Sequence, residues 1–377
     1  MTTVQSAPVK LSVIVPCYDE ETTLSLCVDR ILEIKDNTLS LEIIIVDDAS
    51  RDKSFEIAKQ LEQQHREITV LKHDTNKGKG AALRTGFQRA SGDFVAVQDA
   101  DLEYNPMELK DLLVPLRNNQ AEVVIGSRFL TSGAHRVLYF WHSIGNRFLT
   151  LLSNMFTDLN LTDMESCYKV FRRDIIQSVN LKENRFGFEP EIVAKVAQMR
   201  VRIYEIGISY SGRTYEEGKK IGVKDGIRAL YCVMKYNAHK APLPMQFLVY
   251  VFIGGVSALF NLVLFLGLFH AGIRPAGAAI VAFTTAALLN YLLCISILFK
   301  HRAKWKAPVE WITYAGLVCA VACVDLVVTQ KLLFTGFSPE ISKLSATGIA
   351  FLLNFLGRRF FIFPEKPRGP WRPSSIN

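Results

Sequence analysis

Acidic residues lie directly after short apolar segments in the first half of the chain. After one such segment the chain reads Asp99-Ala100-Asp101-Leu102-Glu103. Alternate side chains of an extended segment point the same way, so Asp99, Asp101 and Glu103 are expected on one face. Three carboxylates on one face repel one another unless a cation lies among them. Their hard oxygens suit Mg²⁺ or Mn²⁺, which usually bind substrate phosphates as well. The pattern predicts a metal site for a nucleotide diphosphate, with a solvated acidic turn as the alternative.

Two earlier apolar segments also end in polar residues. The first runs into Pro16, Tyr18 and Glu20, and the second runs into Asp48. Ligands of parallel sheets bind at the carboxyl ends of the strands, so these residues are expected to face the same crevice as the acids. A turn or a helix cap is the alternative for an isolated pair of acids.

The sequence NKGKG at 76–80 precedes a predicted helix and resembles a loop that holds phosphate. It lacks the Lys-Ser or Lys-Thr end of a Walker A motif, and Leu83 stands where a dinucleotide-binding motif has its third glycine. Nucleoside triphosphatase and dehydrogenase activities are therefore disfavoured. A flexible entry to the helix remains the alternative for this loop.

Residues 11 to about 235 alternate short β-branched segments with helical ones, a pattern typical of an α/β domain with a mostly parallel sheet. We therefore predict a catalytic domain at 1–235. Its expected strands are Leu11–Val15, Leu41–Val46, Ile68–Leu71, Asp93–Gln98 and Glu122–Ile125.

The rest of the 377-residue chain, 236–377, has a different composition. Across the whole chain 49% of residues are hydrophobic and 21% are charged, which is too apolar for an ordinary soluble enzyme. Four segments are long and apolar enough to cross a bilayer, so an all-α membrane domain is predicted. These segments are Gln246–Phe269, Gly277–Phe299, Val309–Phe334 and Ile341–Phe363.

The distribution of charge predicts how the chain lies in a membrane. Basic residues gather in the loop between the second and third expected spans and in the tail, which places both termini in the cytoplasm. No secretory signal peptide is recognised at the start of the chain. The net charge of +8 is accounted for by anionic lipid beside the spans, so no nucleic-acid partner is expected. The chain is predicted to be a multi-pass protein of the cytoplasmic membrane.

The membrane half contains an internal repeat. Adding 64 to the numbers of Asn261, Pro275 and Asn290 gives Asp325, Pro339 and Asn354, and the segments ALLNYLL and AFLLNFL align without a gap. Two similarly oriented helical hairpins are predicted, with chance similarity between leucine-rich helices as the alternative. Asp325 is interpreted as a contact between helices rather than a transport residue.

Two amphipathic helices are expected outside the spans, at 136–156 and 225–236. In the first, Trp141, Ile144 and Phe148 recur at helical spacing while polar residues occupy the other face. A strongly two-faced helix of this kind suits a membrane interface. Packing against the core of the soluble domain is the alternative.

Six motifs in this order resemble family 2 glycosyltransferases of the GT-A fold, and among them the polyprenyl- or dolichyl-phosphate sugar synthases. The motifs are VPCYDE, VDDASRD, NKGKGAALRTG, QDADLEY, GSR and RTYEEGK. The resemblance covers about the first 235 residues, and the remainder is similar to the GtrA-like membrane domain. It implies a metal-dependent, GT-A, Rossmann-like hexosyltransferase whose partners are a nucleotide-diphosphate sugar, a polyprenyl phosphate and the bilayer. Assembly of several copies is left open.

The resemblance also assigns roles to individual residues. It implies that the nucleotide sugar is bound by Pro16, Tyr18, Glu20, Val46, Asp48, Ala100, Arg213 and Lys219. It implies a metal at Asp99, Asp101 and Glu103, although many relatives have Gln at the position of Glu103. Asp99, Asp101 and Arg128 are the expected catalytic residues, and the candidates for the acceptor phosphate are Arg128, Arg136 and Ser143. Asp163 is expected to hold the acceptor loop or to cap a turn, and Glu189 is interpreted as a helix-start acid.

The predicted reaction is an inverting transfer of one sugar, with glucose favoured, from the nucleotide carrier to polyprenyl phosphate. Transfer of mannose from GDP-mannose is the alternative. A processive polysaccharide synthase is disfavoured because no QxxRW motif surrounds any of the four tryptophans. A translocator of lipid-linked sugars with an attached sugar-binding domain is the alternative from another class of protein.

Overall fold

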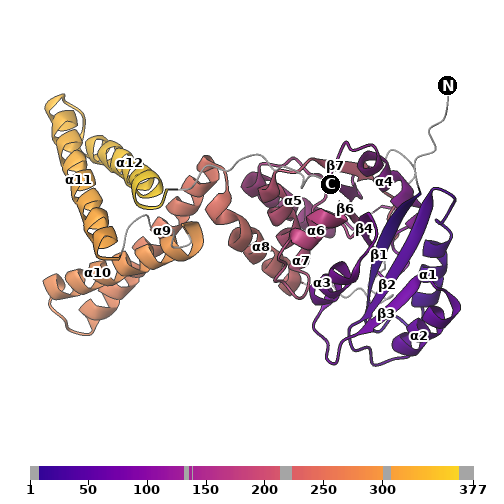
Figure 1. Cartoon of the computed structure of the whole chain (residues 1–377). Coiled ribbons are helices and arrows are strands. Elements are labelled where there is room, and N and C mark those ends of the chain that lie inside the picture. The colour runs from indigo at the N-terminus through magenta and orange to yellow at the C-terminus, as the bar shows by residue number, and fades with distance from the viewer. Residues whose placement is uncertain (1–7, 131–135, 138, 213–222, 300–306, 365–377) are drawn as a thin grey trace, which may run out of the picture. The chain divides into compact units, whose positions relative to one another are not determined.

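The structure is a computed structural model that describes residues 8–130, 136–137, 139–212, 223–299 and 307–364. The described chain divides into two compact units, with the change from one to the other between Asn237 and Ala238. The first unit contains a sheet with helices around it, and the second is helical (Figure 1).

The sheet of the first unit has seven strands in the order β3-β2-β1-β4-β6-β5-β7. All neighbours are parallel except at β6, which runs antiparallel to β4 and β5. The carboxyl ends of β1, β2, β4 and β5 therefore lie at the same edge. The strands are β1 Val9–Cys17, β2 Leu39–Asp47, β3 Ile68–Lys72, β4 Phe94–Val97, β5 Val123–Ser127, β6 Lys169–Arg172 and β7 Ile203–Gly207.

The mostly parallel α/β sheet predicted from the sequence is confirmed, and each of the five expected strands is present with small shifts at its ends. Strands β1, β2 and β5 contain runs of buried Val and Ile because helices cover both faces of the sheet. Figure 1 shows α1 and α2 on one side of β1–β3 and α3 on the other. The helices of this unit are α1 Leu24–Leu32, α2 Ser54–Gln64, α3 Lys79–Arg89, α4 Leu109–Arg117, α5 Phe140–Thr157, α6 Arg173–Ser178, α7 Phe188–Met199 and α8 Val223–Asn237.

Helix α5 buries its polar side and exposes its apolar side. Asn146 and Thr150 are 7% and 3% exposed, whereas Trp141, Phe148 and Leu151 are 79%, 52% and 57% exposed. A helix packed on the soluble core would show the opposite pattern. The alternative of core packing is therefore wrong for the apolar face of α5, and a lipid interface stays a prediction for it.

Helix α8 is held to the first unit by the buried carboxylate of Glu183. This group accepts hydrogen bonds from Arg228 (2.6 and 3.1 Å), Lys235 (2.9 Å) and the hydroxyl of Tyr236 (2.7 Å). Burial by itself raises the pKa of Glu183, but these hydrogen bonds outweigh burial and lower the pKa to about 2. The charged form of Glu183 thus stabilises the docking of α8.

Replacing Glu183 by glutamine should reduce the stability of the protein most at neutral pH. Because the folded pKa lies below the ordinary value of 4.5, the stabilisation is complete above that value and is lost as pH falls towards 2. Between pH 7 and pH 3 the free energy of unfolding should fall by about 2 kcal/mol more in the wild-type chain than in Glu183→Gln. Thermal denaturation of the full chain at both pH values measures this difference. The exposed Glu33→Gln variant is the control, and equal pH dependence in wild type and Glu183→Gln would contradict the assignment.

The second unit consists of two hairpins whose elements repeat with the offset of 64. Helix α9 (Leu243–His270) corresponds to α11 (Ala307–Phe334), and α10 (Pro275–Leu293) corresponds to α12 (Pro339–Gly357). The π-helical turns η3 (Cys294–Leu298) and η4 (Arg358–Ile362) also correspond. Even the left-handed glycines between the helices match, with φ of 86° at Gly272 and 89° at Gly336. The repeat predicted from the sequence is confirmed at the level of these elements.

Among the described residues, three helical stretches are long and apolar enough to cross a membrane: Leu243–His270, Pro275–Leu298 and Ile312–Phe334. The fourth expected span falls on α12 and η4, which are more polar and contain Glu340 and Arg358. Spanning by this last segment stays a prediction.

Candidate active site

The predicted nucleotide-binding residues lie at the carboxyl edge of the sheet. Pro16 of β1 pairs with Val46 of β2, so the ends of these strands are in register. Tyr18 and Glu20 lie on either side of Asp19, which is in the left-handed region (φ 51°) where the chain bends after β1. The carboxylate of Glu20 accepts a hydrogen bond from the Thr23 hydroxyl (2.9 Å). The structure thus brings these residues together as expected, and their contacts with a nucleotide stay predictions.

Asp48 is buried and its carboxylate is used within the chain. It contacts Nδ1 of His73 (2.6 Å) and accepts hydrogen bonds from the backbone N–H groups of Lys77 (2.9 Å) and Gly78 (2.6 Å). Asp48 therefore fixes the start of the NKGKG loop. Recognition of the nucleotide base by this carboxylate stays a prediction.

The glycines of the NKGKG loop permit a close approach of two backbone segments. A Cβ on Gly78 would lie 2.4 Å from the carbonyl oxygen of Asn184, and one on Gly80 would lie 2.4 Å from that of Glu183. The backbone N–H of Ala81 donates to the Asn184 carbonyl (3.1 Å). These contacts explain the glycines without a phosphate, and the structure does not favour the phosphate-binding interpretation of this loop.

The three acids after β4 do not lie in an extended strand. The strand ends at Val97 and the following segment bends, so the alternation expected of an extended chain is lost. Oδ1 of Asp99 lies 2.9 Å from Nζ of Lys79, and Glu103 accepts a hydrogen bond from the hydroxyl of Tyr210 (2.8 Å). Within the described ranges no three His, Cys, Asp or Glu side chains form a group that could hold a metal ion. Asp99 and Glu103 are engaged by different partners, and metal binding by the three acids together stays a prediction.

Asp99 and Asp101 nevertheless fit a divalent ion by their chemistry. Mg²⁺ is usually held by one or two carboxylates together with waters and substrate phosphates, so two side chains are sufficient. Both acids are partly exposed at the carboxyl edge of the sheet, on either side of the buried Ala100. Metal binding by Asp99 and Asp101 stays a prediction, and Glu103 is engaged elsewhere.

Lys79 forms an ion cluster that sequence reasoning missed. Its Nζ lies 2.9 Å from Oδ1 of Asp99 and 3.2 Å from Oε1 of Glu189, and its side chain is 17% exposed. Burial lowers the pKa of Lys79, but the neighbouring negative charges outweigh it and raise the pKa above its ordinary value. Glu189 is in the first turn of α7, as expected, yet its side chain is buried and Oε2 has no hydrogen-bond partner among the residues that the structure describes. The lysine thus carries the positive charge beside an expected metal ligand.

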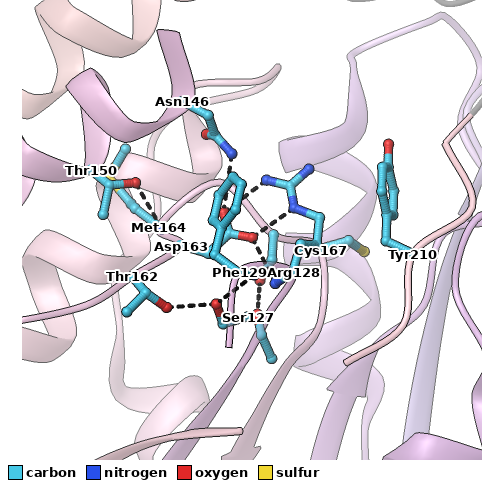
Figure 2. Close-up of polar contacts among 12 residues, drawn as sticks. Ser127, Arg128, Phe129, Asn146, Thr150, Thr162, Asp163, Met164, Cys167 and Tyr210 are labelled. Carbon is cyan, nitrogen blue, oxygen red and sulfur yellow. Dashed lines mark hydrogen bonds and ion pairs between the residues drawn. The ribbon is translucent and has the colours of Figure 1, made fainter. Parts of the chain in front are cut away.

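Arg128 is fixed by a two-pronged ion pair with Asp163. Nε and Nη2 of the arginine donate to the two carboxylate oxygens (2.6 and 2.8 Å), and Asp163 is fully buried (Figure 2). The guanidinium also lies over the ring of Tyr210, 5.1 Å from its centroid. In the described part of the chain Nη1 makes no hydrogen bond. The ion pair therefore sets the plane of the guanidinium and leaves donors for a ligand.

Two further elements hold Asp163 in place. Asn146 of α5 donates to Oδ1 of Asp163 (3.2 Å), and Thr150 of the same helix accepts from the backbone N–H of Met164 (3.2 Å) (Figure 2). Glu205 of β7 accepts from the backbone N–H of Asp163 (3.0 Å). Burial raises the pKa of Glu205, although these backbone hydrogen bonds oppose the shift. The first of the two roles expected for Asp163, holding a loop, agrees with these contacts.

The other acceptor candidates lie near the start of α5. Arg136 is exposed and donates to the backbone carbonyl of Gly212 (2.9 Å). Ser143 is a partly exposed residue in the first turn of the helix. Arg213 and Lys219 lie outside the described residues. Contact of any of these residues with substrate stays a prediction.

Models of known families match the sequence of each unit. The model of "Glycosyl transferase family 2" matches residues 12–179, and that of "GtrA/DPMS, transmembrane domain" matches residues 249–363. The chain belongs to the family 2 glycosyltransferases and carries a GtrA/DPMS transmembrane domain. The membrane protein and the GT-A fold inferred from the sequence are thereby confirmed.

Individual relatives cover one or both units. A dolichol-phosphate mannosyltransferase from Pyrococcus furiosus is 26% identical over 358 residues, which cover 93% of this chain and 98% of the relative. A dolichyl-phosphate beta-glucosyltransferase from Trichomonas vaginalis is 31% identical over 221 residues, covering 54% of this chain and 67% of the relative. The crystal structure of glucosyl-3-phosphoglycerate synthase from Mycobacterium tuberculosis, in complex with Mn²⁺ and UDP, has a TM-score of 0.48 and 19% identity. It covers 61% of this chain and 80% of that one.

Proposed function

We propose that the chain transfers one sugar from a nucleotide-diphosphate sugar to the phosphate of a polyprenyl lipid at the membrane surface. One observation carries this proposal: Asp163 contacts both Arg128 and Asn146 of α5, the helix whose apolar side is exposed. Arg128, a cation that can bind phosphate, is thus connected through Asp163 to a helix whose exposed apolar side can contact lipid. The relatives named for transfer to dolichyl phosphate support the same reaction.

The residues favour a direct attack by the lipid phosphate. The second pKa of a phosphate monoester is near 6, so the attacking oxygen is largely ionised at neutral pH and needs no general base. The difficulty is repulsion between two anions, about 4 kcal/mol for each pair of unit charges at 4 Å and an effective dielectric of 20. Arg128 would offset this repulsion at the acceptor. A divalent ion held by Asp99 and Asp101 would neutralise the leaving diphosphate.

In-line attack inverts the anomeric carbon. An α-linked nucleotide sugar should therefore give a β-linked lipid phosphosugar, which NMR of the purified product can establish. Detection of the α-linked product would overturn the proposed mechanism.

We further propose that glucose is the sugar and that the reaction occurs on the cytoplasmic face, with both termini in the cytoplasm. The named relatives include both a mannosyltransferase and glucosyltransferases, so the donor must be tested directly. Membranes containing the chain should be incubated with undecaprenyl phosphate and radiolabelled UDP-glucose, UDP-N-acetylglucosamine or GDP-mannose. Labelled lipid from UDP-glucose is expected, labelled lipid from GDP-mannose would assign mannose, and no labelled lipid from any donor would contradict the proposal.

Removing the charge of Lys79 should tighten the binding of a divalent ion in the absence of nucleotide. The ammonium lies against Asp99, so a metal must compete with it for the carboxylate. Lys79→Gln should lower the dissociation constant for Mn²⁺ about tenfold, which corresponds to roughly 1.4 kcal/mol. Electron paramagnetic resonance of free Mn²⁺ measures this constant, with the exposed Lys53→Gln as the control. Weaker Mn²⁺ binding would mean that Lys79 supports the ligand instead of competing for it.

A further inference from the structure

One buried arginine lies between equivalent residues of the two repeats in the second unit. Nε of Arg358 donates to Oδ1 of Asn354 (3.1 Å) and Nη1 donates to Oδ1 of Asn290 (3.0 Å). Its guanidinium carbon lies 5.5 Å from the ring centroid of Tyr250 and 4.7 Å from that of Tyr314. Both the asparagines and the tyrosines are pairs separated by 64 residues. The arginine is therefore enclosed by a cage built from both repeats.

The cage holds a cation but no acid. Arg358 is 4% exposed, and within the part of the chain that the structure describes its partners are two amides, two tyrosines and the thiol of Cys294 (3.6 Å). Cys294 is the equivalent of Arg358 in the first repeat, so the duplicated site has one charged member. Burying an ion without an opposite charge is unfavourable. Amide oxygens and aromatic faces offset part of this cost and leave the net charge in place.

The local geometry suits recognition of a phosphate. Two amide oxygens and two rings fix the guanidinium. Because Nε and Nη1 donate to the asparagines and Cys294, charge-assisted hydrogen bonds to a phosphate would come from Nη2. Arg358 begins the π-helical turn η4, a type of turn that is rare and often found at functional sites. The turn is close to the surface, since Phe360 and Phe361 are 55% and 72% exposed.

The surroundings of the cage point to a phosphate carried by a lipid. Apolar side chains are exposed along each of the four helices that lead away from it, including Leu262, Phe283, Leu326 and Leu344. In a membrane protein such side chains contact hydrocarbon. We propose that Arg358, Asn290, Asn354, Tyr250 and Tyr314 form a binding site for the phosphate of a polyprenyl phosphate, separate from the acceptor site at Arg128.

Counting bound lipid tests this site without any sugar transfer. Purified full-length chain is titrated with undecaprenyl phosphate in detergent and examined by native mass spectrometry. Wild type should bind two lipids, and Arg358→Gln should bind the second at least tenfold more weakly. The neighbouring Arg359→Gln, which removes a hydrogen bond to Gln246 (2.8 Å), should bind two and serves as the matched control. A wild type that binds one lipid, or an unchanged second affinity in Arg358→Gln, overturns the proposal.

Competition on the wild-type chain decides the chemistry even if Arg358→Gln does not fold. Undecaprenol, which lacks the phosphate, should displace less than a tenth of the second lipid at equal concentration, and equal displacement overturns the proposal. Inorganic phosphate at the same concentration should also fail to compete, and effective competition would assign the cage to free phosphate instead. Arg128→Gln should lose the other lipid. The count therefore separates failure of this site from failure of the proposed transfer reaction.

Discussion

Replacing Asp101 by alanine should lower sugar transfer about 10³-fold and leave the amount of folded protein in the membrane unchanged. The Asp101 carboxylate is partly exposed and accepts a hydrogen bond from the backbone N–H of Glu103 (3.1 Å). Loss of one such bond typically costs about 1 kcal/mol of stability. Loss of the charge that holds the ion beside the diphosphate should cost far more in the transition state. Initial rates with saturating donor measure the effect.

The exposed Asp29→Ala on α1 is the matched control and should keep wild-type rates. Excess chelator should abolish transfer by the wild-type chain, and added Mn²⁺ or Mg²⁺ should restore it. Full turnover in chelator, or Asp101→Ala rates within a few-fold of wild type, would remove the metal from the proposed mechanism.

Local patterns in the sequence predicted the framework of the site. Continuous β-branched segments such as Leu41–Val46 identified buried parallel strands, and topology then placed their ends at one edge. The sequence also predicts the repeat in the membrane half, because equivalent helices have the same residue types at equivalent positions, such as the proline that begins α10 and α12.

Pairings between distant residues could not be read in the same way. Asp163 is the partner of Arg128 and Glu189 is a partner of Lys79, and neither pair is joined by a period or a motif. Acids are common in the first turn of a helix, so the position of Glu189 in the sequence does not indicate its contact with Lys79. A buried acid without a partner nearby in the sequence indicates a distant cationic partner. Burial, however, is known only once the fold is known.

Two expectations depend on local geometry that the sequence does not show. The alternation of Asp99, Asp101 and Glu103 requires an extended chain, and β4 ends before the first of them. The NKGKG loop resembles one that holds phosphate, whereas its glycines allow a close approach of the backbone at Glu183 and Asn184. For α5 the two-faced pattern was evident, but only the fold shows that its polar face is the one packed inward.

Arg128→Gln should combine a loss of turnover of about 10³-fold with a loss of stability, because the substitution leaves the fully buried Asp163 without its cation. Breaking a buried ion pair by removing one partner typically costs about 3–5 kcal/mol. A fall in activity in this variant alone could therefore reflect unfolding.

The double variant Arg128→Gln, Asp163→Asn separates the two effects. Two neutral amides leave no unpaired buried charge, so the thermal midpoint should recover part of what the single variant loses. Transfer should stay about 10³-fold below wild type, since no cation faces the acceptor phosphate. Recovery of both stability and transfer would show that Arg128 acts only through the fold. Recovery of stability alone would place its charge in the reaction, and the Michaelis constant for undecaprenyl phosphate should then rise in both variants.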